Sequence, residues 1–218
     1  YDMKADPHNV KNLAGDPAHR STLERMRGSL RSWQLEIRDT GFLSEAEMME
    51  RAGSGTIYEM VRDRSKYDLE RLMEAADVSC ERDTANIPRL RKMLKDSDSG
   101  VRFWGATGLL ALGDKARPAT DDLRGALKDS SVCVRIQAAH SLCIMDHCDE
   151  ALPVLERALH HQNQMASLLA ANAIDYLDTK AMPVLKKVMA GAGGGKKGKK
   201  GKNFGKFSGY PARVLQYL

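Results

Sequence analysis

Four residues in the second half of the chain have the types and the spacing of metal ligands. They are His140, Cys143, His147 and Cys148. On one helix His140, Cys143 and His147 would share a face, because residues three, four and seven apart lie one above another. Imidazole and thiolate groups are typical zinc ligands. Scattered histidines and cysteines more often have plain surface or packing roles, so the sequence makes these four weak candidates for a metal site.

Cysteine chemistry is the second possibility, because Cys143 and Cys148 are close enough in sequence to bridge a helix end in an oxidising compartment. With Cys80 and Cys133 they form no CxxC framework. The chain is 42% hydrophobic and can build an apolar core without covalent links. We therefore expect free thiols.

The helices that would position these residues belong to an internal repeat. The sequence LKDSDSGVRFWGATGLLALG occupies Leu94–Gly113, and its pattern recurs in Leu127–Asp146 and more faintly in Leu159–Asp178. The offsets are 33 and 32 residues. A fixed period of this length, with two helical patterns in each unit, is typical of an α-solenoid. The sequence therefore predicts an all-α fold of stacked helical hairpins.

Aligned positions in the three copies predict the faces of the second helix of each pair. Thr107, His140 and Asn172 share a polar position that we expect to face water. The expected buried stripe consists of apolar positions at helical spacing: Leu109, Leu142 and Ile174; Leu112, Met145 and Leu177; and the small residues Ala106, Ala139 and Ala171.

Charged residues also recur. Asp96 and Asp129 stand six residues before Arg102 and Arg135, so ion pairs from one repeat turn to the next are expected. We call this expected series of ion pairs the charge ladder. The third copy has His161 and Ser167 at these positions, so the charge ladder should end there.

This pattern resembles the HEAT-repeat family over Lys66–Leu218. Apolar residues at helical spacing in Tyr67–Val78 predict the first layer of the solenoid, and helix pairs follow it. The expected pairs are Ile87–Lys95 with Val101–Leu112, Thr120–Lys128 with Val132–Met145, and Glu150–His160 with Met165–Leu177.

The first third of the chain has a different pattern. The residues from Tyr1 predict a short strand and turns, with strand partners further upstream. Asp16 is then placed to cap a helix that starts at Pro17. Ser44 and Glu47 have the spacing of a capping box, which predicts a short helix from Glu45.

The same region resembles the closing segment of sulfatases of the alkaline-phosphatase superfamily, with Asn9 or Val10 where an acidic residue often stands. The resemblance is carried by Tyr1-Asp2-Met3, Asp6-Pro7 and Asn12-Leu13-Ala14, and by the helix that ends near Trp33. The continuation TGFLSEAEM and GTIYEMVRD is similar to bacterial sulfatases that carry HEAT repeats. This implies a subdomain remnant at 1–65 and a solenoid at 66–218.

Such sulfatases use calcium and a formylglycine made from Cys or Ser in Cys/Ser-x-Pro-x-Arg. No Cys or Ser stands two residues before a proline here. We therefore expect no catalytic or cofactor-binding residue in this chain. The resemblance implies its own upstream catalytic domain as a partner, and a periplasmic or secreted location.

The net charge of +5 arises from one glycine-rich segment, and without its six lysines the balance is −1. A general affinity for nucleic acid is therefore not indicated. The segment, at about residues 191–209, has too few large apolar side chains to fold and is expected to be a disordered insertion. A solvated loop without a binding role is the favoured interpretation. The alternative is an anion-binding segment for a sulfated, polyanionic glycan, a nucleic acid or an anionic lipid, with these candidate residues: Lys196, Lys197, Lys199, Lys200, Lys202 and Lys206.

Two alternatives to the sulfatase hypothesis remain open. One is a free-standing HEAT module that binds a protein partner. The other is a HEAT-type lyase or the iron-dependent HEAT hydroxylase. The hydroxylase needs His-Glu pairs, and the chain contains no His-Glu dipeptide. No apolar run approaches the length of a membrane span.

Overall fold

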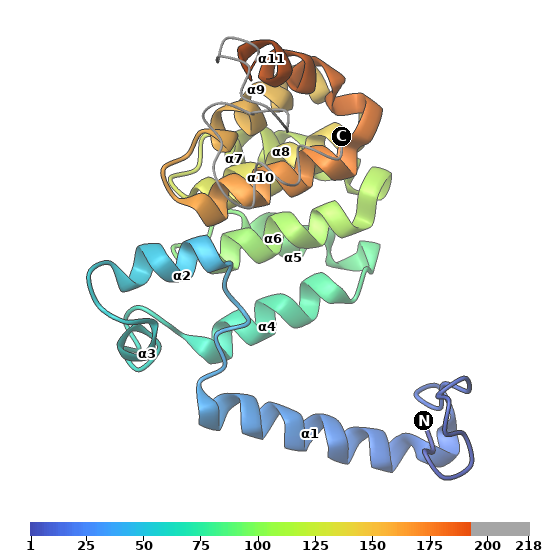
Figure 1. Ribbon diagram of the computed structural model, residues 1–218. Helices are drawn as coiled ribbons and strands as arrows, with labels where there is room; N and C mark the ends of the chain where they lie inside the picture. The colour runs from blue at the N-terminus through green and yellow to red at the C-terminus, as the bar shows by residue number, and fades with distance from the viewer. Residues whose placement is uncertain (193–218) are drawn as a thin grey trace, which may run out of the picture. The chain divides into compact units, whose positions relative to one another are not determined.

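A computed structural model of the chain describes residues 1–192, and residues 193–218 lie outside the described part. Every regular element within residues 1–192 is a helix (Figure 1). The all-α prediction is thus confirmed. Among these residues no helix is both long enough and apolar enough to cross a membrane. The chain divides into two compact units, the first from Tyr1 to Thr40 and the second from Gly41 onward.

The first unit consists of turns, the 3₁₀ helix η1 (Pro17–His19) and the helix α1 (Arg20–Ile37). Asp16 caps η1 as predicted, because its side chain accepts a hydrogen bond of 2.9 Å from the Ala18 N–H. The strand expected at Tyr1 is not formed. The Asp2 and Asp6 carboxylates accept backbone N–H groups and close turns instead. An extended segment needs a neighbouring strand for these groups, and the described residues offer none.

The second unit contains the repeats and two short helices that precede them. Its described helices are α2 (Glu45–Ala52), α3 (Ile57–Met60), α4 (Leu69–Cys80), η2 (Thr84–Asn86), α5 (Ile87–Met93), α6 (Ser99–Leu112), η3 (Gly113–Ala119), α7 (Thr120–Ala126), α8 (Val132–Ile144), α9 (Cys148–Leu159), α10 (Gln164–Leu177), η4 (Asp178–Ala181) and α11 (Met182–Ala192). Each helix pair expected from the repeat lies within a few residues of its predicted bounds. We call α5–α6, α7–α8 and α9–α10 repeats 1, 2 and 3.

The repeats pack in two layers (Figure 1). In one layer α4, α6, α8 and α10 lie side by side, each against the next. In the other layer α5 packs on α6, α7 on α8, α9 on α8 and α10, and α11 on α9. The predicted apolar stripe of the second helices is buried between the packed helices. Its aligned alanines are fully buried, which lets neighbouring helices approach closely: Ala106, Ala139 and Ala171.

Near the end of the second helix of every repeat, the same aligned position has a positive φ angle. Gly113, Asp146 and Asp178 have φ of 57°, 69° and 48°. A positive φ at this position turns the chain out of the helix and back towards the first helix of the next unit. The repeat geometry therefore includes a left-handed residue at each corner, even where the residue is not glycine.

The predicted charge ladder is present. Arg102 donates to both carboxylate oxygens of Asp129 at 2.7 and 2.8 Å, and Arg71 in α4 pairs with Asp96 at 2.5 Å. The third copy has His161 at the position of Asp129, so it offers Arg135 no carboxylate there. Arg135 instead donates to the carbonyls of Asp129 and Ser130. The ladder ends there, as the third copy of the repeat predicted.

Candidate functional site

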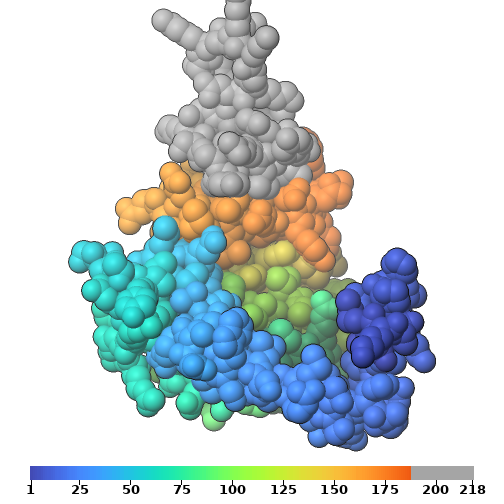
Figure 2. All heavy atoms as spheres, turned by 60° about the horizontal axis from the view of Figure 1, so that its bottom comes forward, coloured from blue at the N-terminus to red at the C-terminus, as the bar shows by residue number. Residues whose placement is uncertain are grey.

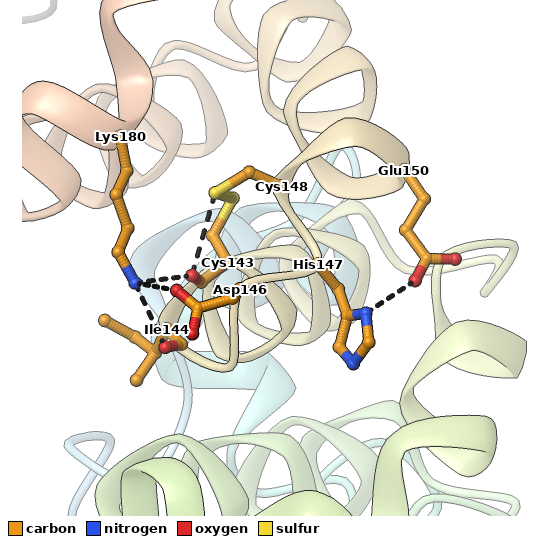
Figure 3. The surroundings of a disulfide bond; sticks show 7 residues. All are labelled: Cys143, Ile144, Asp146, His147, Cys148, Glu150 and Lys180. Atoms are coloured by element: carbon orange, nitrogen blue, oxygen red, sulfur yellow. Dashed lines mark hydrogen bonds and ion pairs between the residues drawn. A yellow bond between two sulfur atoms is a disulfide. The ribbon is translucent and has the colours of Figure 1, made fainter.

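Three of the four candidate metal ligands, Cys143, His147 and Cys148, lie around the turn between α8 and α9 (Figure 3). Cys143 and Cys148 are joined by a disulfide across this turn, with their Cα atoms 4.3 Å apart. The expectation of free thiols at these two positions is therefore wrong. Asp146 has a left-handed backbone, and the His147 N–H donates to the Leu142 carbonyl at 2.9 Å. This tight helix end returns the chain so that Cys148 reaches Cys143.

Two basic residues from the 3₁₀ helices η3 and η4, on either side of repeat 2 and repeat 3 in the sequence, bind the same turn. Lys180 extends its ammonium group to the carbonyls of Cys143 and Ile144, each at 3.2 Å, and to the Asp146 carboxylate at 2.7 Å (Figure 3). Arg117 donates to the Met145 carbonyl at 3.1 Å. Cationic side chains thus satisfy carbonyls that the end of α8 leaves without helical partners. The turn between α8 and α9 is thus bound by residues of η3, which precedes it in the sequence, and of η4, which follows it.

The two histidines do not complete a metal site at this turn. His147 lies beside Glu150, with Nδ1 3.7 Å from the carboxylate, and it points away from the disulfide (Figure 3). His140 lies further up α8 in the packing against α10. Both cysteine sulfurs are used in the disulfide. Residues 1–192 contain no group of three or more His, Cys, Asp or Glu side chains that could hold a metal ion.

His140 does not face water, which corrects the interpretation of its aligned position. Its side chain is buried, and its ring meets that of Tyr176 edge to face with centroids 5.1 Å apart. Burial lowers the pKa of His140 to about 4, and Nε2 has no hydrogen-bond partner among the described residues. Asn172 at the aligned position of α10 is exposed. His140 differs from Asn172 because the ring of Tyr176 in α10 packs against it. The aligned position of His140 by itself does not indicate this contact.

A buried polar cluster that the sequence did not reveal lies where α2 crosses the beginnings of α6 and α8. Its centre is the carboxylate of Glu47, which is only 6% exposed. The predicted cap at Ser44 is present, since its hydroxyl accepts the Glu47 N–H at 3.3 Å. The Glu47 side chain does not return to Ser44 to complete the capping box, and reaches the repeats instead. The capping spacing was therefore a correct signal for the helix and gave no indication of the cluster.

The outer side of α2 borders an open depression of about 570 Å³. Met49 and Glu50 line one side, and residues 161–165 line the other. Asn163, one of the lining residues, caps α10 through its side-chain oxygen, and its amide donates to the Ala46 carbonyl. The depression therefore lies beside α2, and its lining residues include none of the disulfide turn.

An unpartnered apolar stripe runs along α1 in the first unit. No residue of α1 is buried, and four large apolar side chains are 45–59% exposed: Met26, Leu30, Trp33 and Ile37. Their spacing of four, three and four residues places them on one side of the helix. The other sequence candidates, Lys196, Lys197, Lys199, Lys200, Lys202 and Lys206, lie outside the described residues.

Comparison with known proteins supports the class of fold that this geometry defines. Residues 87–177 match a model of HEAT repeats, and this range coincides with α5–α10. The three helical hairpins, their alanine contacts and the Arg102–Asp129 pair lie within this match and form a HEAT-type helical module. Modules of this class present extended surfaces formed by stacked repeats.

A part of the chain is also similar to an ulvan-active sulfatase from Formosa agariphila. The two are 28% identical over 87 residues, which are 40% of this chain and 14% of the sulfatase. The chain thus matches a small share of that protein's length, and the similarity by itself does not assign the enzyme's activity to it.

Proposed function

We propose that the chain is a non-catalytic HEAT-repeat region of a sulfatase-like sulfuric ester hydrolase, which packs against its own catalytic domain and presents the repeats to a partner. The observation that carries the proposal is the exposed apolar stripe of α1. This helix lies in Tyr1–Trp33 and its continuation, the segment whose motifs resemble the end of a sulfatase subdomain. The local similarity to the ulvan-active sulfatase supports the same hypothesis.

The physical reason is the cost of leaving the stripe in water. Full burial of a fully exposed Leu stabilises by roughly 1.5–3 kcal/mol. Leu30 and Trp33 are about half exposed, so covering them would recover a part of such a gain at each position. Single exposed apolar residues are common, but a continuous row on one face of an 18-residue helix marks a contact surface. In the proposal this surface is covered by the catalytic domain, which would also supply the calcium and the formylglycine.

The first experiment compares the 218-residue chain with the product of the same gene including its upstream coding sequence. We expect the upstream sequence to contain Cys/Ser-x-Pro-x-Arg, the longer protein to hydrolyse a small aryl sulfate, and the 218-residue chain to be inactive. Turnover by the 218-residue chain, or an upstream sequence that lacks the motif, would contradict the proposal and favour a free-standing HEAT module.

The second experiment tests the α1 surface. Leu30→Asp with Trp33→Asp places charge on the stripe, whereas Ser29→Asp with Ser32→Asp places the same charge on exposed polar positions of α1. In the longer protein we expect only the stripe variant to become sensitive to proteolysis around residues 37–44. Equal sensitivity of the two variants would show that the stripe is not a packing surface.

A further inference from the structure

Helix α2 and the residues directly before it, from Phe42 onward, contact all three repeats although they belong to none of them. Stacked repeats normally contact only their neighbours, so their stability propagates along one dimension. Here the Trp104 indole in α6 donates to the Phe42 carbonyl at 2.8 Å, and the Asn163 amide at the start of α10 donates to the Ala46 carbonyl at 3.2 Å. Between these contacts the Ser44 hydroxyl lies 3.1 Å from the sulfur of Cys133 in α8.

The Glu47 carboxylate joins repeats 1 and 2 through a single side chain. It accepts hydrogen bonds from the Ser99 hydroxyl at the start of α6 and from the Ser131 hydroxyl, at 3.0 Å, at the start of α8. Both positions are helix N-termini, where a negative charge is favourable. Because the carboxylate is buried, it depends on these donors to replace the water that it has lost.

Arg51, one turn further along α2, completes the cluster. Its guanidinium donates to Glu47 at 3.0 Å and to the Asp98 carboxylate at 2.6 and 3.2 Å. Asp98 is the N-cap of α6, and Arg51 also donates to the Lys66 carbonyl at 2.8 Å. Burial by itself opposes ionisation, but the hydrogen bonds from Arg51 hold the pKa of Asp98 below its usual value. The whole pair therefore stays charged at neutral pH.

We propose that α2 is a clasp that makes the three repeats open and close as one cooperative unit. A contact across one repeat interface stabilises two neighbours, whereas α2 ties the beginnings of α6, α8 and α10 to one another. Figure 2 shows the light-blue residues of this part of the chain lying against the green and orange residues of the repeats. The clasp holds the edge formed by these helix starts at a constant spacing, and a partner would meet a rigid surface.

The test measures cooperativity and not only stability. Glu47→Gln keeps the shape of the side chain and removes its charge, and Glu45→Gln is the matched control on the exposed side of the same helix. Leu142→Ala serves as a core control, because Leu142 is fully buried within repeat 2. Native-state hydrogen exchange of the amides of α6 and α10 is measured in each variant of the 218-residue chain.

In the unmodified chain and in the Glu45 variant, we expect the slowest amides of α6 and α10 to exchange at rates that agree within about threefold, as expected for one opening unit. Leu142→Ala should speed both helices alike. Glu47→Gln weakens the link between the starts of α6 and α8. The α10 amides, which lie beyond that link, should then exchange at least tenfold faster than those of α6. Equal acceleration in both helices, or no acceleration, would overturn the clasp and leave Glu47 as an ordinary local contact.

Asn163→Ser provides an independent variant if Glu47→Gln does not fold. Serine keeps the capping of α10, since it is also a favourable N-cap, but is too short to reach the Ala46 carbonyl. We expect this change to speed exchange in α10 while α6 keeps its native rate. The same rates as the unmodified chain in both helices would contradict the proposal.

Discussion

Arg102 in repeat 1 holds Asp129 in the turn of repeat 2 through two hydrogen bonds, from Nε and Nη2, to the two carboxylate oxygens. Both side chains are nearly buried, at 13% and 9% exposure. The equivalent Arg71 is 44% exposed. These two Arg–Asp pairs between neighbouring helices thus differ in their contact with solvent, and the recurring positions in the sequence did not include Arg71.

Arg102→Met should destabilise the fold by about 3–5 kcal/mol, because it leaves the Asp129 carboxylate buried without its cation. Arg71→Met is the matched control and should cost no more than about 1 kcal/mol, since water screens an exposed pair. Urea unfolding at neutral pH measures both. Similar losses in the two variants would show that burial does not set the strength of the two pairs.

The stability of the second unit should fall in mildly acidic solution because of His140. Burial lowers its pKa to about 4 in the folded chain, whereas an unfolded histidine titrates near 6.5. The unfolded chain therefore binds the proton first, and the contribution is complete above pH 6.5 and lost as the pH falls towards 4. The total should approach about 3 kcal/mol. His140→Phe should remove this slope between pH 6.5 and 4, and an unchanged slope in a urea-melt series would place the titrating group elsewhere.

Gly105 should not tolerate a side chain, because α5 and α6 approach too closely there. A Cβ at this position would lie 3.0 Å from the Leu90 carbonyl oxygen and 3.2 Å from the Leu94 nitrogen, and neither backbone atom can move freely. Gly105→Ala should cost about 1–3 kcal/mol. Gly125→Ala in α7 meets nothing within 4 Å and should stabilise by up to about 1 kcal/mol. Thermal unfolding of the two variants should therefore shift in opposite directions, and equal shifts would contradict the close approach.

Reduction of the Cys143–Cys148 disulfide should lower stability only modestly. The bond closes a loop of few residues, so the chain-entropy estimate is about 2 kcal/mol. Lys180 and Arg117 continue to bind the carbonyls of the turn after reduction, which should preserve its shape. The melting temperature with and without a reductant measures the effect, with the Cys143→Ser, Cys148→Ser variant as the control that must not respond. A response of that variant would show that the reductant acts at another site.

Much of the fold could be predicted from the sequence because the information is local and repeated. A helix cap such as Asp16 depends on residues two or three positions away. The buried alanine positions recur in each copy, of which Ala139 is the central one, and each copy constrains the others. Even the pairing of Arg102 with Asp129 follows from the period, since each repeat presents the same side chain to the next.

Only the tertiary structure decided the contacts that bring non-equivalent segments together. Glu47 has the spacing of a capping residue, yet its carboxylate binds serines 52 and 84 residues further along the chain. His140 occupies a position that is polar in every copy, and it is buried because Tyr176 of the next repeat covers it. A local sequence pattern does not indicate which distant side chain will contact a residue. Burial and ion pairing depend on the surface of the other segment. The sequence by itself determined the repeating helices, and the packing between distant segments determined which polar residues lie inside.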